Sequence, residues 1–204
     1  DRVHFVGNPM IDTLFTALPL TANRPEFDGI SLPDEYAVLT LHRPSNVDDA
    51  GELDALVKVL LECAERLPIV APIHPRSLGA LQARGFPEHQ EVIALPPIGY
   101  TEFLSLMRHS SAVITDSGGV QEETTVLGVP CLTVRPNTER PVTIQSGTNQ
   151  LVSPRTLLAE LDSLLEIEDF RESARKSGPA LWDGAAGERI ANIICQSDYL
   201  VESG

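Results

Sequence analysis

Short apolar runs alternate with amphipathic stretches along most of the chain. Such runs, bounded by Gly, Pro or polar residues, are typical of strands that are buried on both faces. We expect strands at Ala37–Leu41, Ile69–Ile73, Val92–Leu95, Ala112–Ile114, Cys131–Val134 and Asn149–Val152. The stretches between them have helical periodicity, and we expect helices at Leu53–Leu67, Ser77–Arg84, Thr101–Arg108 and Val120–Leu127. This alternation predicts the α/β class, as a doubly wound parallel sheet with helices on both faces.

The two ends of the chain add elements outside this alternation. We expect a strand at Val3–Val6 and a helix at Met10–Leu18, followed by a polar connection from Pro19 to Pro33 that several prolines interrupt. Three closing helices are expected at Leu157–Leu165, Phe170–Lys176 and Ile190–Leu200. Because the chain begins at Asp1, we expect it to be part of a longer protein.

Polar residues directly follow the predicted strands, where the chain leaves the sheet. In doubly wound sheets, ligands bind outside the carboxyl ends of the strands. Polar or proline-containing segments follow the strands at His42-Arg43, His74, Pro97-Ile98, Asp116 to Gly119, and Arg135 to Arg140. We expect these segments to converge on one rim of the sheet.

The segment from Ser117 to Glu123 is the most informative part of this rim. Ser117-Gly118-Gly119 joins a strand to a helix, and the two glycines let a ligand approach the backbone closely. A helix start favours an anion such as phosphate, because its unpaired N–H groups carry partial positive charge. Glu123 lies ~9 Å further along the helix, about the distance from a phosphate to the ribose of one nucleotide. Since a carboxylate can accept both ribose hydroxyls, the segment predicts a nucleotide site.

Two of these features have simpler alternatives. Gly118 and Gly119 can serve only for tight packing of a helix on a strand, with Ser117 as a helix cap. His42 is a candidate general acid or base, or a hydrogen-bond donor to phosphate, but it can also be a surface histidine beside a solvated Arg43.

Further along the rim, His74 repeats the His42 pattern and strengthens the anion-site hypothesis. Arg140 can reach a diphosphate or a sugar hydroxyl, or it can pair with Glu139 or with a helix carboxylate. Phe103, near Tyr100, can stack on a nucleotide base or belong to the core.

Composition limits the function classes. Apolar residues make up 42% and charged residues 22% of the chain, which is ordinary for a globular protein. The net charge of −14 disfavours a nucleic-acid partner, which needs clustered Lys and Arg. No apolar run approaches the ~20 residues that span a bilayer, so we expect no membrane partner. The three cysteines are far apart and odd in number, which favours a reduced, cytoplasmic context.

Several kinds of chemistry lack their sequence signals. The histidines do not have metal-ligand spacing, and no cluster of Cys or carboxylate residues supports a zinc site. The chain has neither a glycine-rich dinucleotide fingerprint nor a Gly-Lys-Ser/Thr phosphate loop. We therefore expect no metal and no cofactor, and a kinase, ATPase or NAD-dependent activity is not supported.

The strand-end residues resemble those of a known family, the non-hydrolysing UDP-N-acetylglucosamine 2-epimerases. The similarity runs in order through Gly7-Asn8-Pro9-Met10-Ile11-Asp12, Leu41-His42-Arg43, Pro72-Ile73-His74-Pro75, Thr115 to Glu123, Thr138-Glu139-Arg140-Pro141 and Trp182-Asp183-Gly184. The resemblance covers the C-terminal half of the family pattern. It implies one of two Rossmann-like domains in the arrangement of the GT-B glycosyltransferases, with the active site in the cleft between them.

This resemblance implies an enzyme that interconverts UDP-N-acetylglucosamine (UDP-GlcNAc) and UDP-N-acetylmannosamine (UDP-ManNAc) by eliminating UDP and adding it back. By position, Ser117, Gly118 and Gly119 would hold phosphate, Glu123 the ribose and Phe103 the uracil. His42 would be a catalytic residue, with Arg43, His74 and Arg140 near the diphosphate or sugar. The family's proposed acid and base carboxylates belong to the other domain, so this chain alone should bind UDP weakly and turn nothing over.

The resemblance also implies a division of the chain and a context. We expect an interdomain element and linker at residues 1–33, a Rossmann-like UDP-binding domain at 34–180 and a C-terminal closing helix at 181–204. A full-length protein is expected to be a cytoplasmic homodimer. Pro44-Ser45-Asn46 departs from the family pattern after His-Arg, which leaves the sugar open. A nucleotide-binding domain of a GT-B glycosyltransferase and a non-catalytic UDP-sugar-binding module remain alternatives.

Overall fold

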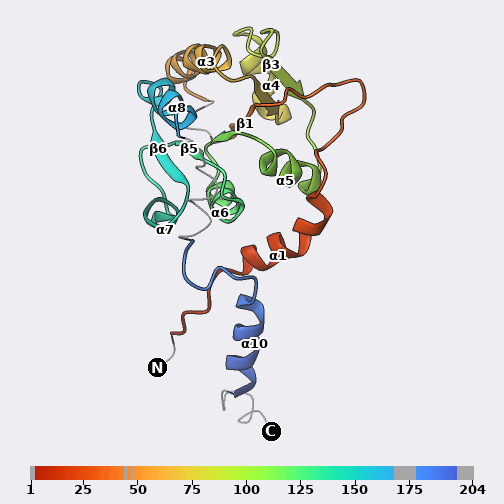
Figure 1. Cartoon of the computed structure of the whole chain (residues 1–204). Helices are drawn as coiled ribbons and strands as arrows, with labels where there is room; N and C mark the ends of the chain where they lie inside the picture. The colour runs from red at the N-terminus through yellow and green to blue at the C-terminus, as the bar shows by residue number, and fades with distance from the viewer. Residues whose placement is uncertain (1–2, 44–45, 47, 168–177, 197–204) are drawn as a thin grey trace.

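A six-stranded parallel sheet forms the centre of the protein (Figure 1). The computed structural model describes residues 3–43, 46, 48–167 and 178–196. The strands are β1 (Ala37–Thr40), β2 (Ile69–Pro72), β3 (Val92–Leu95), β4 (Ala112–Thr115), β5 (Cys131–Val134) and β6 (Asn149–Val152). Their order is β3-β2-β1-β4-β5-β6, and all neighbours pair in parallel. Because the order reverses beside β1 and β4, the topological switch point lies between these two strands.

Helices pack on both faces of the sheet and divide the core in two. The helices on one face are α3 (Ala50–Ala64), α4 (Pro75–Gln82) and α8 (Leu157–Leu165). Those on the other are α1 (Pro9–Ala17), α5 (Tyr100–Arg108) and α6 (Gly118–Leu127), with the short 3-10 helix η1 (Leu18–Thr21) beside α5. Alternate residues of β1 enter the two halves, since Leu39 packs with the first set and Val38 with the second. The short helix α7 (Pro141–Gln145) joins β5 to β6.

The doubly wound, Rossmann-like fold is therefore confirmed. Every central strand lies where the apolar runs predicted it, and the predicted helices between them exist with small differences at their ends. The most useful difference concerns α6, which begins at Gly118 instead of Val120, so both glycines belong to its first turn.

The predicted strand at Val3–Val6 is wrong. These residues form no strand, and Val3 and Phe5 are 88% and 73% exposed. Apolar character alone does not make a strand, because strand hydrogen bonds need a neighbouring strand. The carbonyl of Val6 instead accepts a hydrogen bond from the Arg189 side chain at 3.2 Å.

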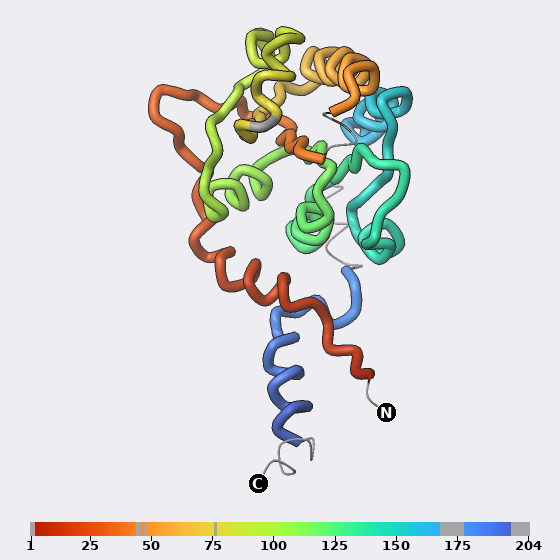
Figure 2. Tube along the Cα trace, turned by 180° about the vertical axis from the view of Figure 1, so that it is seen from behind, coloured from red at the N-terminus to blue at the C-terminus, as the bar shows by residue number. Residues whose placement is uncertain are grey.

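Helix α10 (Ala186–Gln196) lies against α1 and extends away from the sheet (Figures 1 and 2). The Asp12 carboxylate accepts hydrogen bonds from the N–H groups of Ala186 and Gly187 at 3.1 and 2.6 Å, so a residue of α1 caps α10. The extended segment 3–8 leaves the domain on the same side (Figure 2). The helix predicted at Phe170–Lys176, and the predicted part of the last helix beyond Gln196, lie outside the described residues.

Candidate functional site

Asp116 organises the rim at the switch point. It follows β4 and is fully buried, because β1 and β5 flank its strand. Its carboxylate accepts hydrogen bonds from the backbone N–H groups of His42, at 3.1 and 3.2 Å, and of Arg43, at 2.9 Å. The Asn46 side-chain amide donates to the same carboxylate at 3.1 Å and to the carbonyl of Val134 at 3.1 Å. One buried acid therefore fixes the loop after β1 against both β4 and β5.

The same carboxylate orients the His42 ring. Nδ1 of His42 lies 3.1 Å from Oδ1 of Asp116, while half of the histidine side chain remains exposed. When Nδ1 carries its hydrogen toward Asp116, Nε2 is left to face a ligand. This pairing gives His42 a defined direction, which a solvated surface histidine would lack.

Arg43 and His74 lie at the same end of the sheet as His42. Arg43 is half-buried and its guanidinium lies 3.9 Å from Glu139 in the loop after β5. His74 is exposed just beyond β2, the neighbour of β1. The strand order therefore brings the predicted residues at the ends of β1, β2, β4 and β5 to one rim.

The helix start at Ser117 to Gly119 is open. A side-chain carbon added at Gly118 would meet no atom within 4 Å, and one at Gly119 would meet only Met10 Cε at 3.5 Å, an ordinary contact. Ser117 is the N-cap residue but its side chain makes no capping hydrogen bond. Tight packing therefore does not account for the glycines. The free space leaves the first-turn N–H groups accessible to an anion.

Gln121 holds the loop after β5 against α6. It is fully buried, its amide donates to the carbonyl of Ser117 at 3.1 Å, and its oxygen accepts from Thr138 at 2.6 Å and Asn149 at 3.2 Å. Thr138 in turn accepts a hydrogen bond from the N–H of Arg140 at 2.9 Å. This network places Arg140 beside the first turns of α6.

Glu122 binds the Arg140 side chain. Its Oε1 lies 2.8 Å from Nε of Arg140 and accepts a hydrogen bond from the Asn8 amide at 3.0 Å, and the carboxylate is 5% exposed. We considered that Arg140 contacts a ligand or pairs with a carboxylate of the protein. The structure contains the ion pair with a helix carboxylate. Arg140 nevertheless keeps 41% of its side chain exposed, so its guanidinium can still contact a ligand.

Glu123 is also largely buried, at 7% exposed, and its carboxylate interacts with the Tyr100 hydroxyl of α5. Burial raises the pKa of Glu123, the neighbouring Tyr100 hydroxyl lowers it, and the charge of Glu122 raises it further. A carboxylate with a perturbed pKa on the rim of a sheet is a common feature of functional sites.

Phe103 lies in α5, one turn after Tyr100. It is half-buried and packs against the core on the α5 and α6 face. Phe103 therefore belongs in part to the core, as one of the two alternatives predicted, and it remains partly accessible on the helix that also carries Tyr100.

Three further residues shape the site without having been predicted as site residues. Asp116 directly precedes Ser117, but its sequence position predicts no role. Glu122 is adjacent to Glu123, to which we assign the ribose, and nothing in the sequence marks Gln121 as a site residue. A buried charged or amide side chain must be hydrogen-bonded. Once the structure shows that all three are buried, their hydrogen bonds account for their polar character.

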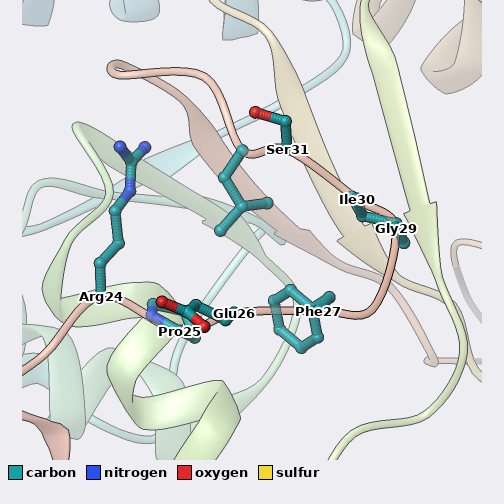
Figure 3. Close-up of a pocket in the computed structure, with 8 residues that line it drawn as sticks. Arg24, Pro25, Glu26, Phe27, Gly29, Ile30 and Ser31 are labelled. Atoms are coloured by element: carbon teal, nitrogen blue, oxygen red, sulfur yellow. The ribbon is translucent and has the colours of Figure 1, made fainter.

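Two hollows lie near these elements. One is lined by Asn46, Arg135 and Leu151 among others, at the carboxyl ends of β5 and β6, and continues the rim. The other is formed by residues 24–27 and 29–32 in the connection before β1 (Figure 3). The charged residues Arg24 and Glu26 and the apolar residues Phe27 and Ile30 all line this second hollow. None of the predicted site residues lines it.

Among the residues that the structure describes, no helix has the combination of length and apolar character that crossing a membrane requires. Over the same residues, no three His, Cys, Asp or Glu side chains are grouped so that they can hold a metal ion.

Comparison with known proteins gives consistent matches. The sequence pattern of a family described as UDP-N-acetylglucosamine 2-epimerase matches residues 1–195. The chain is 33% identical to the UDP-N-acetylglucosamine 2-epimerase of Methanocaldococcus jannaschii, over 98% of this chain and 56% of the relative. It is 35% identical to the UDP-2,3-diacetamido-2,3-dideoxy-D-glucuronate 2-epimerase of Pseudomonas aeruginosa, over 82% of this chain and 46% of the relative.

Solved structures agree with these matches. The M. jannaschii enzyme in complex with UDP-GlcNAc and UDP superposes with a TM-score of 0.79 at 31% identity, over 96% of this chain and 55% of that one. The Neisseria meningitidis UDP-GlcNAc 2-epimerase bound to UDP-GlcNAc gives 0.80 at 27% identity, over 97% and 56%. The chain thus spans about half the length of the proteins it matches.

Proposed function

Because the chain belongs to the UDP-N-acetylglucosamine 2-epimerase family, we propose that it is the UDP-sugar-binding part of an enzyme that interconverts UDP-GlcNAc and UDP-ManNAc. The observation that carries this proposal is the open helix start at Gly118 and Gly119, with Glu123 further along the same helix. Anion-binding groups and a diol-binding carboxylate then lie at the spacing of a nucleotide.

In this proposal the diphosphate lies at the start of α6. Ser117, Gly118 and Gly119 contribute N–H groups and the partial positive charge of the helix. Arg43 and Arg140 supply additional positive charge from the two flanking loops. Preorganised donors of this kind stabilise the charge that develops when a diphosphate departs.

The other predicted residues at the carboxyl end of the sheet have the following proposed roles. Glu123 accepts the ribose hydroxyls, Phe103 contacts the uracil, and His74 contacts the diphosphate or sugar. His42, oriented by Asp116, acts at the bond between the sugar and the diphosphate, where Nε2 is the reactive atom. The reaction removes the C2 proton and expels UDP from C1, and UDP then adds back after the proton returns on the other face. The electron pair of the C2–H bond forms a C1–C2 double bond and that of the C1–O bond leaves with UDP, so the sequence is redox-neutral and we propose no cofactor.

We also propose how the chain fits a full-length enzyme. Residues 34–180 form the UDP-binding domain, residues 1–33 connect it to a second domain, and residues 181–204 close the chain. The capping of α10 by Asp12 supports this division, because it ties the last helix to the connecting segment. We propose a cytoplasmic homodimer, and the unpaired state of Cys63, Cys131 and Cys195 supports the reducing compartment.

Calorimetric titration of the chain with UDP and with inorganic phosphate tests the nucleotide assignment. Glu123→Ala should weaken UDP binding about tenfold or more and leave phosphate binding nearly unchanged, because phosphate has no ribose. Equal losses for both ligands would remove the ribose assignment.

Activity is tested on the full-length protein that contains this chain, by proton NMR of UDP-GlcNAc in the presence of enzyme. The account predicts a signal of UDP-ManNAc, and His42→Asn should slow its appearance by about 10²-fold or more. Release of free sugar or its transfer to an acceptor, without UDP-ManNAc, would contradict the epimerase proposal.

A further inference from the structure

Asn46 connects the buried acid of the site to the neighbouring strand β5. Its side-chain amide nitrogen donates to Oδ2 of Asp116 at 3.1 Å and to the carbonyl oxygen of Val134, the last residue of β5, at 3.1 Å. Asp116 is fully buried and Val134 is 3% exposed, so both acceptors lie inside the domain. Because an amide has two N–H groups, both donors of Asn46 are used within the protein.

The two oxygens of the Asp116 carboxylate have different partners. Oδ2 accepts from the Asn46 amide and from the backbone N–H of Arg43, at 3.1 and 2.9 Å, while Oδ1 lies 3.1 Å from Nδ1 of His42. The backbone N–H of His42 is shared between the two oxygens, at 3.2 and 3.1 Å. An ionised carboxylate has about four lone-pair positions, so these four donors occupy all of them. With Oδ2 occupied in this way, Oδ1 is the oxygen that faces the ring.

Asn46 is the donor that ties this carboxylate to the sheet. The backbone N–H groups of His42 and Arg43 belong to the loop whose position the carboxylate sets, so they can move together with it. Asn46 also binds the backbone of β5, which pairs with β4 and β6 inside the sheet. Removing the amide would leave a buried acceptor of Asp116 unpaired and would free the carboxylate to turn away from His42.

The charged side chains beside Asn46 do not supply this hydrogen bond. Glu52 of α3 and Arg135 after β5 line the same hollow as Asn46. Arg135 directs both terminal nitrogens of its guanidinium to Glu139, at 2.8 and 2.7 Å. An ionised Glu52 has no donor to offer. The contact with Asp116 therefore depends on the amide of Asn46.

We propose that Asn46 is a positioning residue for His42, which acts through Asp116 to hold the ring in the tautomer with its hydrogen on Nδ1. This inference rests on the proposed function, because it takes His42 to be the catalytic residue. The hydrogen bond at one ring nitrogen decides which nitrogen is protonated. A histidine free in water prefers its hydrogen on Nε2, so a fixed acceptor at Nδ1 is needed to leave Nε2 open to the substrate.

The tautomer can be measured on the chain itself by long-range ¹H–¹⁵N NMR of the His42 ring, at about pH 9, where an ordinary imidazole is neutral. In the wild type, Nδ1 should appear as the protonated nitrogen and Nε2 as the unprotonated one. Asn46→Leu removes the amide and keeps a side chain of similar size, and Asn46→Ala is the second variant if the first does not fold. In either variant the two ¹⁵N signals should move toward each other, because the other tautomer becomes populated.

The same variants in the full-length protein that contains this chain test the effect on turnover. Asn46→Leu should lower kcat by about tenfold or more, because a misdirected ring reacts poorly. KM should change by less than about twofold, because Asn46 does not contact the substrate.

Ser77→Ala is the matched control for stability. The Ser77 hydroxyl is buried and donates at 3.2 Å to the carbonyl of Leu41, the residue directly before His42. Its loss weakens the anchoring of the same loop without touching Asp116. Ser77→Ala should therefore lower the unfolding temperature and keep both the wild-type tautomer and the wild-type kcat.

The outcomes separate positioning from anchoring. If the folded Asn46 variants keep the wild-type tautomer and kcat, Asn46 only anchors the loop and the inference is wrong. The same change of tautomer in Ser77→Ala would also overturn it, because any loosening of the loop would then be sufficient. A wild-type ring with its hydrogen on Nε2 would contradict it directly.

Failure of the proposed function gives a different result. Full-length His42→Asn with normal epimerisation would remove the catalytic role of His42, and with it the expected loss of kcat in the Asn46 variants. The tautomer measurement does not depend on that role, so it tests the contact between Asn46, Asp116 and His42 separately.

Discussion

The Asp116 carboxylate lies 3.1 Å from Nδ1 of His42 and also accepts the backbone N–H group of the same histidine. One fully buried acid thus fixes both the main chain and the ring of the candidate catalytic residue. This arrangement makes the geometry of the loop after β1 depend on the residue that follows β4.

Replacing Asp116 by Asn should therefore destabilise the domain and misdirect His42. An amide presents one donor to a site that contains N–H groups, so at least one buried donor loses its acceptor, which costs about 1–3 kcal/mol. Urea unfolding measures the loss. Asp34→Asn is the matched control, because Asp34 is fully exposed and should change stability by less than ~0.5 kcal/mol. Equal stability of the two variants would show that Asp116 is not the organising residue.

Glu122→Gln should loosen the loop that carries Arg140. The change removes the charge that pairs with Arg140, and we expect a loss of about 1–2 kcal/mol, limited by the partial exposure of the arginine. Glu62→Gln, on the exposed side of α3, is the control for charge. A crystal structure of Glu122→Gln should show Arg140 displaced. An unmoved Arg140 with unchanged stability would contradict the positioning role of Glu122.

Asp12→Ala should release α10 without unfolding the sheet. Loss of this cap removes the acceptor for two N–H groups of α10 and should cost about 1 kcal/mol. Hydrogen exchange should become faster for the amides of α10 and stay slow in β4. As a comparison, Asp49→Ala removes the cap of α3. Because α3 packs on the sheet, this change should lower global stability. Faster exchange in β4 after Asp12→Ala would argue against a local role.

The cysteines should differ sharply in reactivity. Burial raises the pKa of Cys63 to about 12 and that of Cys131 to about 11, so neither forms a reactive thiolate near neutral pH. Cys195 is exposed on α10. A thiol reagent should therefore titrate one group rapidly in the native protein, and Cys195→Ser should abolish this reaction. More than one rapid equivalent would contradict the burial of the other two.

The central sheet can be predicted from the sequence, because each strand is a short apolar run between helical stretches. Most strands also pair with the strand that precedes or follows them in the chain. The strand at Val3–Val6 was predicted wrongly, since no local pattern reveals whether a partner strand exists. For the same reason, the contact between Asp12 and α10 escaped prediction, as it joins residues from opposite ends of the chain.

The positions of the predicted site residues follow from the sequence in part. His42, Arg43, His74 and Ser117 to Gly119 lie at one rim, as their places at strand ends predict. The residues that hold them, Asp116, Gln121 and Glu122, act through contacts across the sheet that a linear sequence does not contain. Glu123 lies on α6 as the sequence predicts, but its interaction with Tyr100 depends on the packing of α5 against α6.

We propose above all that the start of α6 binds the diphosphate of UDP. Titration of the ¹⁵N-labelled chain with UDP, followed by two-dimensional NMR, tests it most directly. The account predicts the largest amide shifts at Gly118 and Gly119, because their N–H groups would donate to phosphate, with smaller shifts around Phe103. Unchanged Gly118 and Gly119 amides, with the main shifts in the connection at residues 24–32, would contradict it.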